Sequence, residues 1–161
     1  MRVLMESGRS DVLLAVMRRT DPPSYGSMLA AGATALTEAW DANPRASQDH
    51  FMLGGAEEWF YRGLAGIDFD MSRKKDERIT IRPALVDGLD SAKGSYNSVL
   101  GWVNTEWQRD EDDIRVTVNV PANATATVVL PGGSKSLDGA RLVGNDFVVD
   151  AGVHRFVVRT K

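Results

Sequence analysis

The stretch that decides the fold is IRVTVNVPANATATVVL, residues 114–130. In its first half, Val116, Val118 and Val120 alternate with polar residues, and after Pro121 a similar alternation resumes through Val129. A period of two residues is that of a β-strand with one buried face and one exposed face. Proline, asparagine and small residues between the two halves are typical of a turn. The stretch therefore predicts two strands separated by a turn.

Similar patterns surround this stretch from residue 78 onward. The other strand candidates are residues 79–81, 94–107, 141–149 and 154–159. Runs rich in Asp, Asn, Gly and Pro separate them. Short strands at this spacing, with turn chemistry between them, predict an antiparallel β-sandwich. Trp102 and Trp107 lie in one of these candidates and are expected in the core, although tryptophans on a sheet face also stack on sugar rings.

The N-terminal part of the chain follows a helical pattern instead. We expect helices over residues 11–19 and 24–31, with Pro22 and Pro23 between them ending the first. A third helix, opening at residues 47–50, is apolar around most of its circumference, as buried helices are. Residues 68–77 are strongly charged. The sequence thus predicts an α+β fold, with helices over 1–67, a connector over 68–77 and the antiparallel β-sandwich over 78–161.

Composition excludes several classes of function. The 161 residues include 19 basic and 22 acidic side chains, a net charge of −3 that favours neither nucleic acid nor an anionic membrane as partner. The absence of cysteine excludes disulfides, thiolate metal sites and a cysteine nucleophile. We find no Asp/Asn loop with calcium-ligand spacing, so we expect no metal and no cofactor. No apolar run approaches the roughly 20 residues of a membrane span, and the first ten residues lack a signal-peptide pattern, which predicts a soluble chain.

Carboxylates and aromatic residues crowd the end of the helical part. They are Glu38, Trp40, Asp41, Asp49, His50, Glu57, Glu58 and Trp59. Carboxylates bind sugar hydroxyls and transfer protons, and indole rings stack on sugars, so this mixture is typical of carbohydrate sites. The alternative is structural: Glu57 and Glu58 are solvated helix positions, Asp49 caps a helix, and the two tryptophans are core. The residues alone leave both interpretations open.

The order of residues in the chain resembles a known family. The motifs that carry the resemblance are Tyr-Gly-Ser-Met at 25–28, Gly-Ala-Thr-Ala-Leu-Thr-Glu-Ala-Trp-Asp at 32–41, Ser-Gln-Asp-His-Phe-Met-Leu-Gly at 47–54, Glu-Trp-Phe-Tyr-Arg-Gly-Leu-Ala-Gly-Ile at 58–67, Ile-Arg-Pro at 81–83 and Val-Pro-Ala-Asn-Ala-Thr-Ala at 120–126. Together they are similar to the C-terminal end of bacterial α-L-rhamnosidases of glycoside hydrolase family 78. In that family an (α/α)6 barrel of six helical hairpins precedes a β-sandwich. The resemblance implies that this chain holds the last barrel helices and the sandwich.

The resemblance also implies site residues. Glu38 matches the general base that activates water for an inverting displacement at the anomeric carbon. His50 matches a histidine that contacts the bound sugar, and Trp40 matches an aromatic residue near the base. An inverting base needs room for a water molecule, with the acid carboxyl roughly 6.5 to 9.5 Å away. The implied enzyme is an inverting α-L-rhamnosidase that acts on rhamnose-containing glycosides.

The helical part holds less than a whole barrel. Twelve helices and their loops need roughly 190 residues, far more than residues 1–67 provide. In the family, the general acid lies upstream, so we expect the isolated chain to be inactive. Apolar residues such as Phe51, Met52, Trp59 and Phe60 would be exposed, which predicts a homo-oligomer or an upstream barrel half as partner. The alternative function is a non-catalytic carbohydrate-binding or association module.

Overall fold

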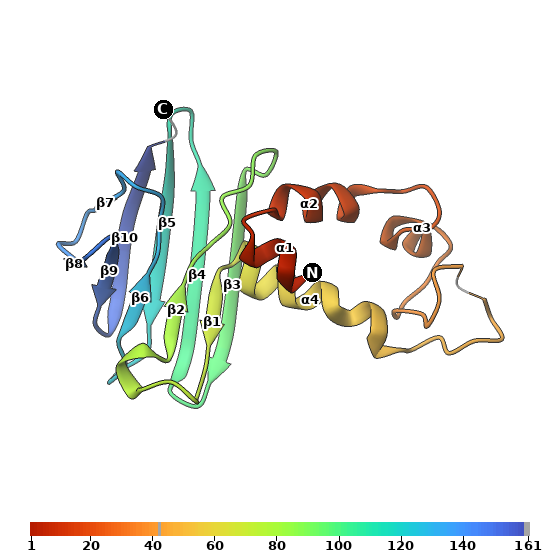
Figure 1. The fold of residues 1–161 in the computed structure, drawn as a ribbon, viewed down its shortest axis with the longest axis horizontal. Helices are drawn as coiled ribbons and strands as arrows, with labels where there is room; N and C mark the ends of the chain where they lie inside the picture. Colours follow the sequence, from red (N-terminus) through yellow and green to blue (C-terminus); the bar gives the residue numbers. More distant parts are fainter. Residues whose placement is uncertain (42, 160–161) are drawn as a thin grey trace. The chain divides into compact units, whose positions relative to one another are not determined.

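The computed structural model describes residues 1–41 and 43–159, which divide into two compact units, Met1–Trp59 and Phe60–Lys161 (Figure 1). The first unit is helical and the second is a β-sandwich. The α+β fold class is therefore confirmed. Residue 42, expected in a turn, and residues 160–161, at the end of the predicted sandwich, lie outside the described residues.

The first unit contains short helices that precede and follow a long irregular segment, which lies between α3 and η1. The helices are α1 (Arg2–Glu6), α2 (Ser10–Arg18), α3 (Tyr25–Ala30), η1 (Phe51–Gly55) and α4 (Ala56–Glu58). A π-helical turn, η2 (Trp59–Leu64), continues α4, and its residues from Phe60 onward belong to the second unit. Each helix of the described chain is too short or too polar to span a membrane.

Local chemistry explains where these helices begin. In α3, Ser24 and Ser27 form a capping box, each side chain accepting a hydrogen bond from the other's backbone N–H. The third expected helix begins at Phe51 rather than within residues 47–50, because the His50 ring caps it by accepting the N–H of Met52. The small core includes Leu13, Leu14 and Trp59.

The second unit consists of two five-stranded sheets. In spatial order, one sheet contains β1 (Ile67–Phe69), β2 (Ile79–Ile81), β6 (Ala126–Val128), β9 (Asp146–Val149) and β8 (Arg141–Val143). The other contains β3 (Ser91–Ser98), β4 (Gly101–Arg109), β5 (Asp113–Val120), β10 (Gly152–Arg159) and β7 (Lys135–Ser136). A short 3-10 turn, η3 (Lys75–Glu77), precedes β2. Neighbouring strands are antiparallel except β2 and β6, which pair in parallel after the chain has built β3–β5 in the other sheet.

The alternation that predicted the strands places the core. Val116, Val118 and Val120 are buried, and the core also includes Trp107, which is fully buried. The Trp107 indole N–H donates to the carbonyl of Leu64 at 2.9 Å.

Four expectations for the second unit differ from the structure. The single strand over 141–149 is wrong, because β8 and β9 pair as an antiparallel hairpin there, with Gly144 and Asn145 between them. The single strand over 94–107 is wrong, because Ser98 and Gly101 close the β3–β4 hairpin there and Gly101 takes a φ of 115° that favours glycine. The core position expected for Trp102 is also wrong: its side chain is 56% exposed. Successive side chains of a strand point to opposite faces, and Trp102 is an odd number of positions from both Val103 and Trp107 along β4. Trp102 therefore lies on the other face of the sheet. Finally, β1 occupies residues 67–69, at the start of the expected connector.

Candidate functional site in the irregular segment

The predicted site residues lie in and beside the irregular segment between α3 and η1. Two backbone hydrogen bonds hold residues 36–38 and residues 47–50 side by side. We call these two stretches the limbs of the segment. The N–H of Glu38 donates to the carbonyl of Ser47 at 2.9 Å, and the N–H of His50 donates to the carbonyl of Leu36 at 2.8 Å. Glu38 and His50 are therefore on adjacent limbs, although they are twelve positions apart in the sequence.

Glu38 presents an exposed carboxylate. Its Oε2 accepts the backbone N–H of Ser47 at 3.2 Å, which orients the group from the opposite limb. Within the residues that the structure describes, Oε1 makes no hydrogen bond and Glu38 forms no ion pair. One carboxylate oxygen is thus held while the other is available to a water molecule or a hydroxyl group.

Thr37 anchors the backbone next to Glu38. Its side chain is almost fully buried, and its hydroxyl donates to the carbonyl of Ala39 at 2.7 Å. The same hydroxyl lies 3.7 Å from Sδ of Met28, a buried residue of α3. This residue was not predicted as part of the site. The signal that could have found it is its place in the Ala-Leu-Thr-Glu sequence of residues 35–38, directly before the candidate base.

The half-buried ring of His50 is fixed by its own helix. Nδ1 accepts the N–H of Met52 at 3.1 Å, so the proton of the neutral ring is assigned to Nε2. The ring also stacks on Phe51, with centroids 4.8 Å apart. His50 can therefore donate a hydrogen bond through Nε2 to a ligand hydroxyl or carbonyl.

Trp40 packs against Tyr25, a residue that was not predicted as part of the site. The two rings meet edge to face, with centroids 5.0 Å apart, and Trp40 remains 37% exposed. The Tyr25 hydroxyl donates to the carbonyl of Leu53 at 2.8 Å. Burial raises the pKa of Tyr25, so its hydroxyl keeps the proton that it donates. Tyr25 thereby connects the position of Trp40 to η1.

Of the other residues of the predicted cluster, Asp41 accepts the backbone N–H of Asn43 through Oδ1 at 3.2 Å. Asp49 is exposed, and His50 rather than Asp49 caps η1.

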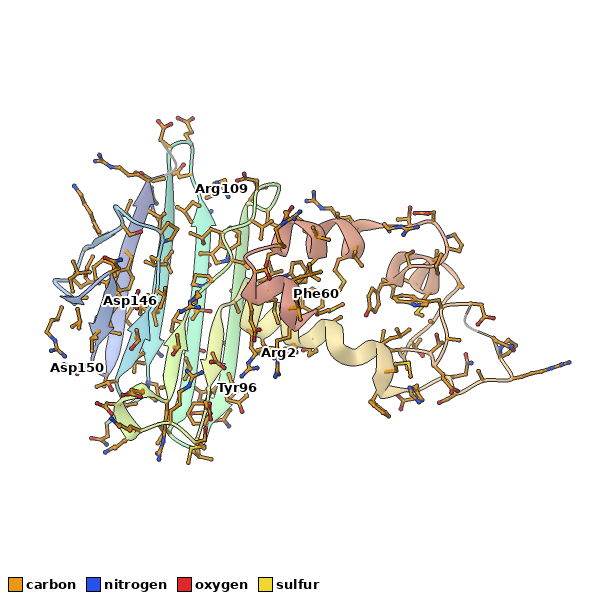
Figure 2. The ribbon with its side chains drawn as sticks, in the orientation of Figure 1. Arg2, Phe60, Tyr96, Arg109, Asp146 and Asp150 are labelled. Carbon is orange, nitrogen blue, oxygen red and sulfur yellow. The ribbon has the colours of Figure 1, made fainter. Side chains whose placement is uncertain are left out.

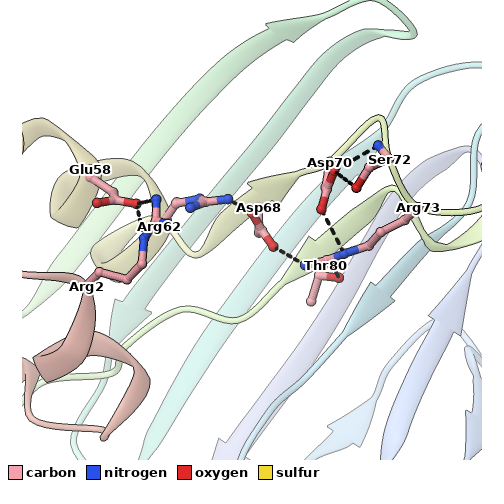
Figure 3. Close-up of polar contacts among 8 residues, drawn as sticks. All are labelled: Arg2, Glu58, Arg62, Asp68, Asp70, Ser72, Arg73 and Thr80. Carbon is pink, nitrogen blue, oxygen red and sulfur yellow. Dashed lines mark hydrogen bonds and ion pairs between the residues drawn. The ribbon is translucent and has the colours of Figure 1, made fainter.

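Glu58 forms an ion pair with Arg2, as Figure 3 shows. Glu57 is exposed, and Trp59 is a core residue whose indole N–H donates to Oγ of Ser10 at 3.2 Å. Trp59 is thus not the exposed apolar residue that an incomplete barrel led us to expect, because it fills the space between its helix and α2.

A second polar cluster lies in the sandwich unit, close to β1 and β2. Asp68 bridges Arg62 and Arg73, and Arg73 also pairs with Asp70 at 3.3 Å (Figure 3). Because these charged groups form ion pairs with one another, we interpret the cluster as a structural network. In the described residues no group of three or more His, Asp or Glu side chains is arranged to hold a metal ion.

Comparison with known families identifies both parts of the chain. Residues 1–64 match the bacterial α-L-rhamnosidase six-hairpin glycosidase domain, and residues 77–142 match the bacterial α-L-rhamnosidase C-terminal domain. The predicted resemblance is therefore confirmed.

Individual relatives agree with the family assignment. An α-L-rhamnosidase of Streptomyces avermitilis is 30% identical over 97% of this chain, and one of Alteromonas sp. is 30% identical over 80% of it. The chain spans 17% and 15% of the lengths of these relatives.

Solved structures share the fold. The crystal structure of the Streptomyces avermitilis α-L-rhamnosidase complexed with L-rhamnose superimposes on 98% of this chain with a TM-score of 0.82 and 28% identity, using 17% of its own length. The α-L-rhamnosidase of Dictyoglumus thermophilum superimposes on 99% of this chain with a TM-score of 0.82 and 26% identity, using 20% of its own length.

Proposed function

Because the chain belongs to the bacterial α-L-rhamnosidase family, we propose that it supplies the general base and part of the sugar pocket of an inverting α-L-rhamnosidase. The substrates of this enzyme are rhamnose-containing glycosides. In this proposal Glu38 is the base, and His50 and Trp40 contact the rhamnose unit.

The observation that carries the proposal is the state of the Glu38 carboxylate. A general base needs a positioned carboxylate with a lone pair for the proton of the attacking water. The Ser47 N–H holds Oε2, while Oε1 makes no hydrogen bond within the described residues. In the reaction, Oε1 accepts a proton from water as the water oxygen attacks the anomeric carbon. The leaving group departs from the opposite face of the sugar, with inversion.

The two sugar-contacting roles follow from the exposed groups of His50 and Trp40. His50 uses Nδ1 to cap η1, which leaves its Nε2–H for a sugar hydroxyl. Trp40 is packed by Tyr25 on one side and partly exposed, so its indole can contact the apolar face of a pyranose ring.

We further propose that the isolated chain is catalytically inactive. Inverting glycosidases need a second carboxyl group as general acid, which typically contributes about 10² to 10⁴ in rate. In this proposal the acid comes from the upstream part of a barrel. The partner is either that upstream half or a second copy of the chain. Exposed apolar side chains of the helical unit, which include Leu29, Phe51 and Met52, support such a partner surface.

The first test of this proposal uses the chain alone. We expect no hydrolysis of p-nitrophenyl α-L-rhamnoside by the purified chain, and weak binding of L-rhamnose by calorimetry. Hydrolysis that disappears in Glu38→Gln would contradict the proposed inactivity and place the acid within this chain or its oligomer.

The second test restores a complete barrel. The chain replaces the matching region of the Streptomyces avermitilis α-L-rhamnosidase, which aligns with 97% of it. In this chimaera, Glu38→Gln is expected to lower kcat by about 10² to 10⁴ with little change in KM, because the base acts in the transition state. The matched control is Glu57→Gln, an exposed glutamate of α4 that should leave kcat unchanged.

The outcome of the second test also distinguishes the proposed function from the alternative function of a non-catalytic module. An active chimaera in which Glu38→Gln and Glu57→Gln are equally active would remove Glu38 from the mechanism. If in addition the chain alone bound L-rhamnose, a non-catalytic carbohydrate-binding module would be the better interpretation. Circular dichroism of both variants checks that the substitutions leave the fold intact.

A further inference from the structure

The sandwich unit has a polar outer face on the sheet of β3, β4 and β5. The strand register aligns two rows of outward-facing side chains across these strands. The first row is Lys93, Glu106 and Thr117, and the second row is Ser95, Asn104 and Asn119. Their neighbours along each strand, such as Val103 and Val118, face the core. The two rows therefore form a continuous surface rather than isolated polar positions.

This surface is the floor of an open cleft of about 590 Å³, and we call it the outer-sheet cleft. All six side chains of the two rows line it, together with Phe60 and Tyr61 from η2. Figure 2 shows Phe60 where this helical turn approaches β3. The volume falls in the range of about 300 to 1,000 Å³ that is usual for small-molecule sites. Every residue that lines the cleft belongs to the sandwich unit.

The polar side chains on this floor have no partners among the residues that the structure describes. In the described part of the chain, none of the six makes a side-chain hydrogen bond or an ion pair. Lys93 and Glu106 lie directly opposite each other in the register, yet their charged groups are not paired. Amide, hydroxyl, ammonium and carboxylate groups are thus all available to a ligand that offers many donors and acceptors.

Aromatic rings are exposed at two ends of this surface. Phe60 and Tyr61 are 42% and 38% exposed on the β3 side. Trp102 is 56% exposed and precedes Asn104 by two positions on β4, so it lies about 7 Å further along the same face. A large indole exposed beside unpaired amides has no role in the core of the sandwich.

We propose that the outer-sheet cleft binds an oligosaccharide chain. Each pyranose ring has an apolar face that stacks on an aromatic ring and a rim of hydroxyl groups that both donate and accept hydrogen bonds. Trp102 and Tyr61 provide stacking surfaces, and Asn104, Asn119 and Glu106 bind the hydroxyls between them. One lysine and one glutamate balance in charge, so the cleft lacks the positive field that nucleic acid requires.

This inference goes beyond the proposed function, since it concerns a second site that shares no residue with Glu38, His50 and Trp40. The cleft would hold a glycan chain without cleaving it. Binding at the cleft is therefore expected whether or not the base assignment is right.

The experiment measures binding of two soluble probes, rhamnogalacturonan oligosaccharides and cellohexaose, to the full chain by calorimetry. We expect at least one probe to bind, and Trp102→Ala to weaken that binding by about tenfold, as loss of one stacking surface does. The double variant Asn104→Ala, Asn119→Ala should weaken it by a similar factor. Because all three side chains lie on the outer face, these substitutions should preserve the fold, which thermal melts can check.

Matched controls come from the other sheet and from the irregular segment. Leu142→Ala removes an exposed apolar side chain of β8, and Asn145→Ala removes an exposed amide next to it; neither should change the affinity. Glu38→Gln should leave the affinity for cellohexaose, which contains no rhamnose unit, unchanged, and this separates the cleft from the proposed rhamnose site. If neither probe bound, the proposal would be overturned. Binding of either probe that survives both cleft variants, or cellohexaose binding that is lost in Glu38→Gln, would also overturn it.

Discussion

The two units of this chain stabilise themselves by different means. Among the described residues, six of the buried apolar side chains belong to the unit Met1–Trp59 and 19 belong to the sandwich unit. The sandwich is connected by strand ladders between distant parts of the sequence, whereas the helical unit has short helices and a segment held by a few side-chain and backbone contacts. Stability and the proposed catalysis are thus placed in different units.

This contrast has a functional reason. A site needs exposed polar groups such as the Glu38 carboxylate, and those groups contribute little to a core. The sandwich pairs its backbone groups in ladders and buries its alternate side chains, so it needs no partner to form a core. We therefore expect the helical unit to unfold at a lower denaturant concentration than the sandwich.

The largest expected effect tests the stability of the sandwich core. Trp107→Ala removes a fully buried indole and its hydrogen bond to Leu64, and should destabilise the sandwich by about 3–5 kcal/mol. Trp102→Ala in the same strand is the control and should change stability by no more than about 0.5 kcal/mol, because that ring is exposed. Urea unfolding of both variants provides the measurement. Equal losses would mean that Trp102 also supports the core.

A smaller effect tests the core of the helical unit. Trp59→Phe keeps an aromatic ring but removes the indole N–H that donates to Ser10, and should cost about 1–3 kcal/mol. Hydrogen exchange should quicken in α2 and stay unchanged in β4 and β5. The half-exposed Trp40, changed to Phe, serves as the control. Faster exchange throughout the sandwich would show that the two units do not unfold separately.

The start of α3 offers a test of about 1 kcal/mol. Ser24→Ala removes the side-chain half of the capping box and should destabilise the helical unit by about that amount. Ser24→Gly is expected to cost only a few tenths of a kcal/mol. Hydrogen exchange at α3 distinguishes the two variants. If alanine and glycine have the same effect, the cap does not determine where this helix starts.

The smallest expected effect compares the two units through the pKa values of two aspartates and their response to salt. A hydrogen bond from the Arg9 side chain lowers the pKa of Asp11 in the helical unit, whereas hydrogen bonds from the Ser72 hydroxyl and backbone lower the pKa of Asp70 in the sandwich unit. In both cases the contribution to stability is present above the ordinary aspartate pKa and disappears as pH falls through the lowered value.

Salt should distinguish these two aspartates. It screens the charge of Arg9 and should raise the pKa of Asp11 more than that of Asp70, whose main partner is a neutral hydroxyl. Carbon-13 NMR titration of the carboxyl groups measures both values. Ser72→Ala should raise the pKa of Asp70 at any salt concentration, and Ser134→Ala, on a distant loop, should not. Equal salt responses would contradict the assigned causes.

Part of the site could be predicted from the sequence. The order of residues around Glu38, Trp40 and His50 carries the family resemblance, and that assignment is confirmed, while their chemical roles stay predictions. The supporting residues Thr37 and Tyr25 were missed, because each acts through a contact with a residue of another segment. Nothing in the local pattern indicates that Tyr25 meets Trp40 or that the Ser47 N–H reaches the Glu38 carboxylate.

By itself, the sequence determined that helices come first and β-strands follow, because period, capping residues and turn chemistry act between near neighbours in the chain. It also determined the family, through motifs of contiguous residues. Only the tertiary structure decided which strands share a sheet, where the β3–β4 hairpin turns, and that Trp107 is buried while Trp102 is exposed. Those outcomes depend on strand register and on contacts such as the one between Trp107 and Leu64, which join residues far apart in the sequence and form only when the chain packs.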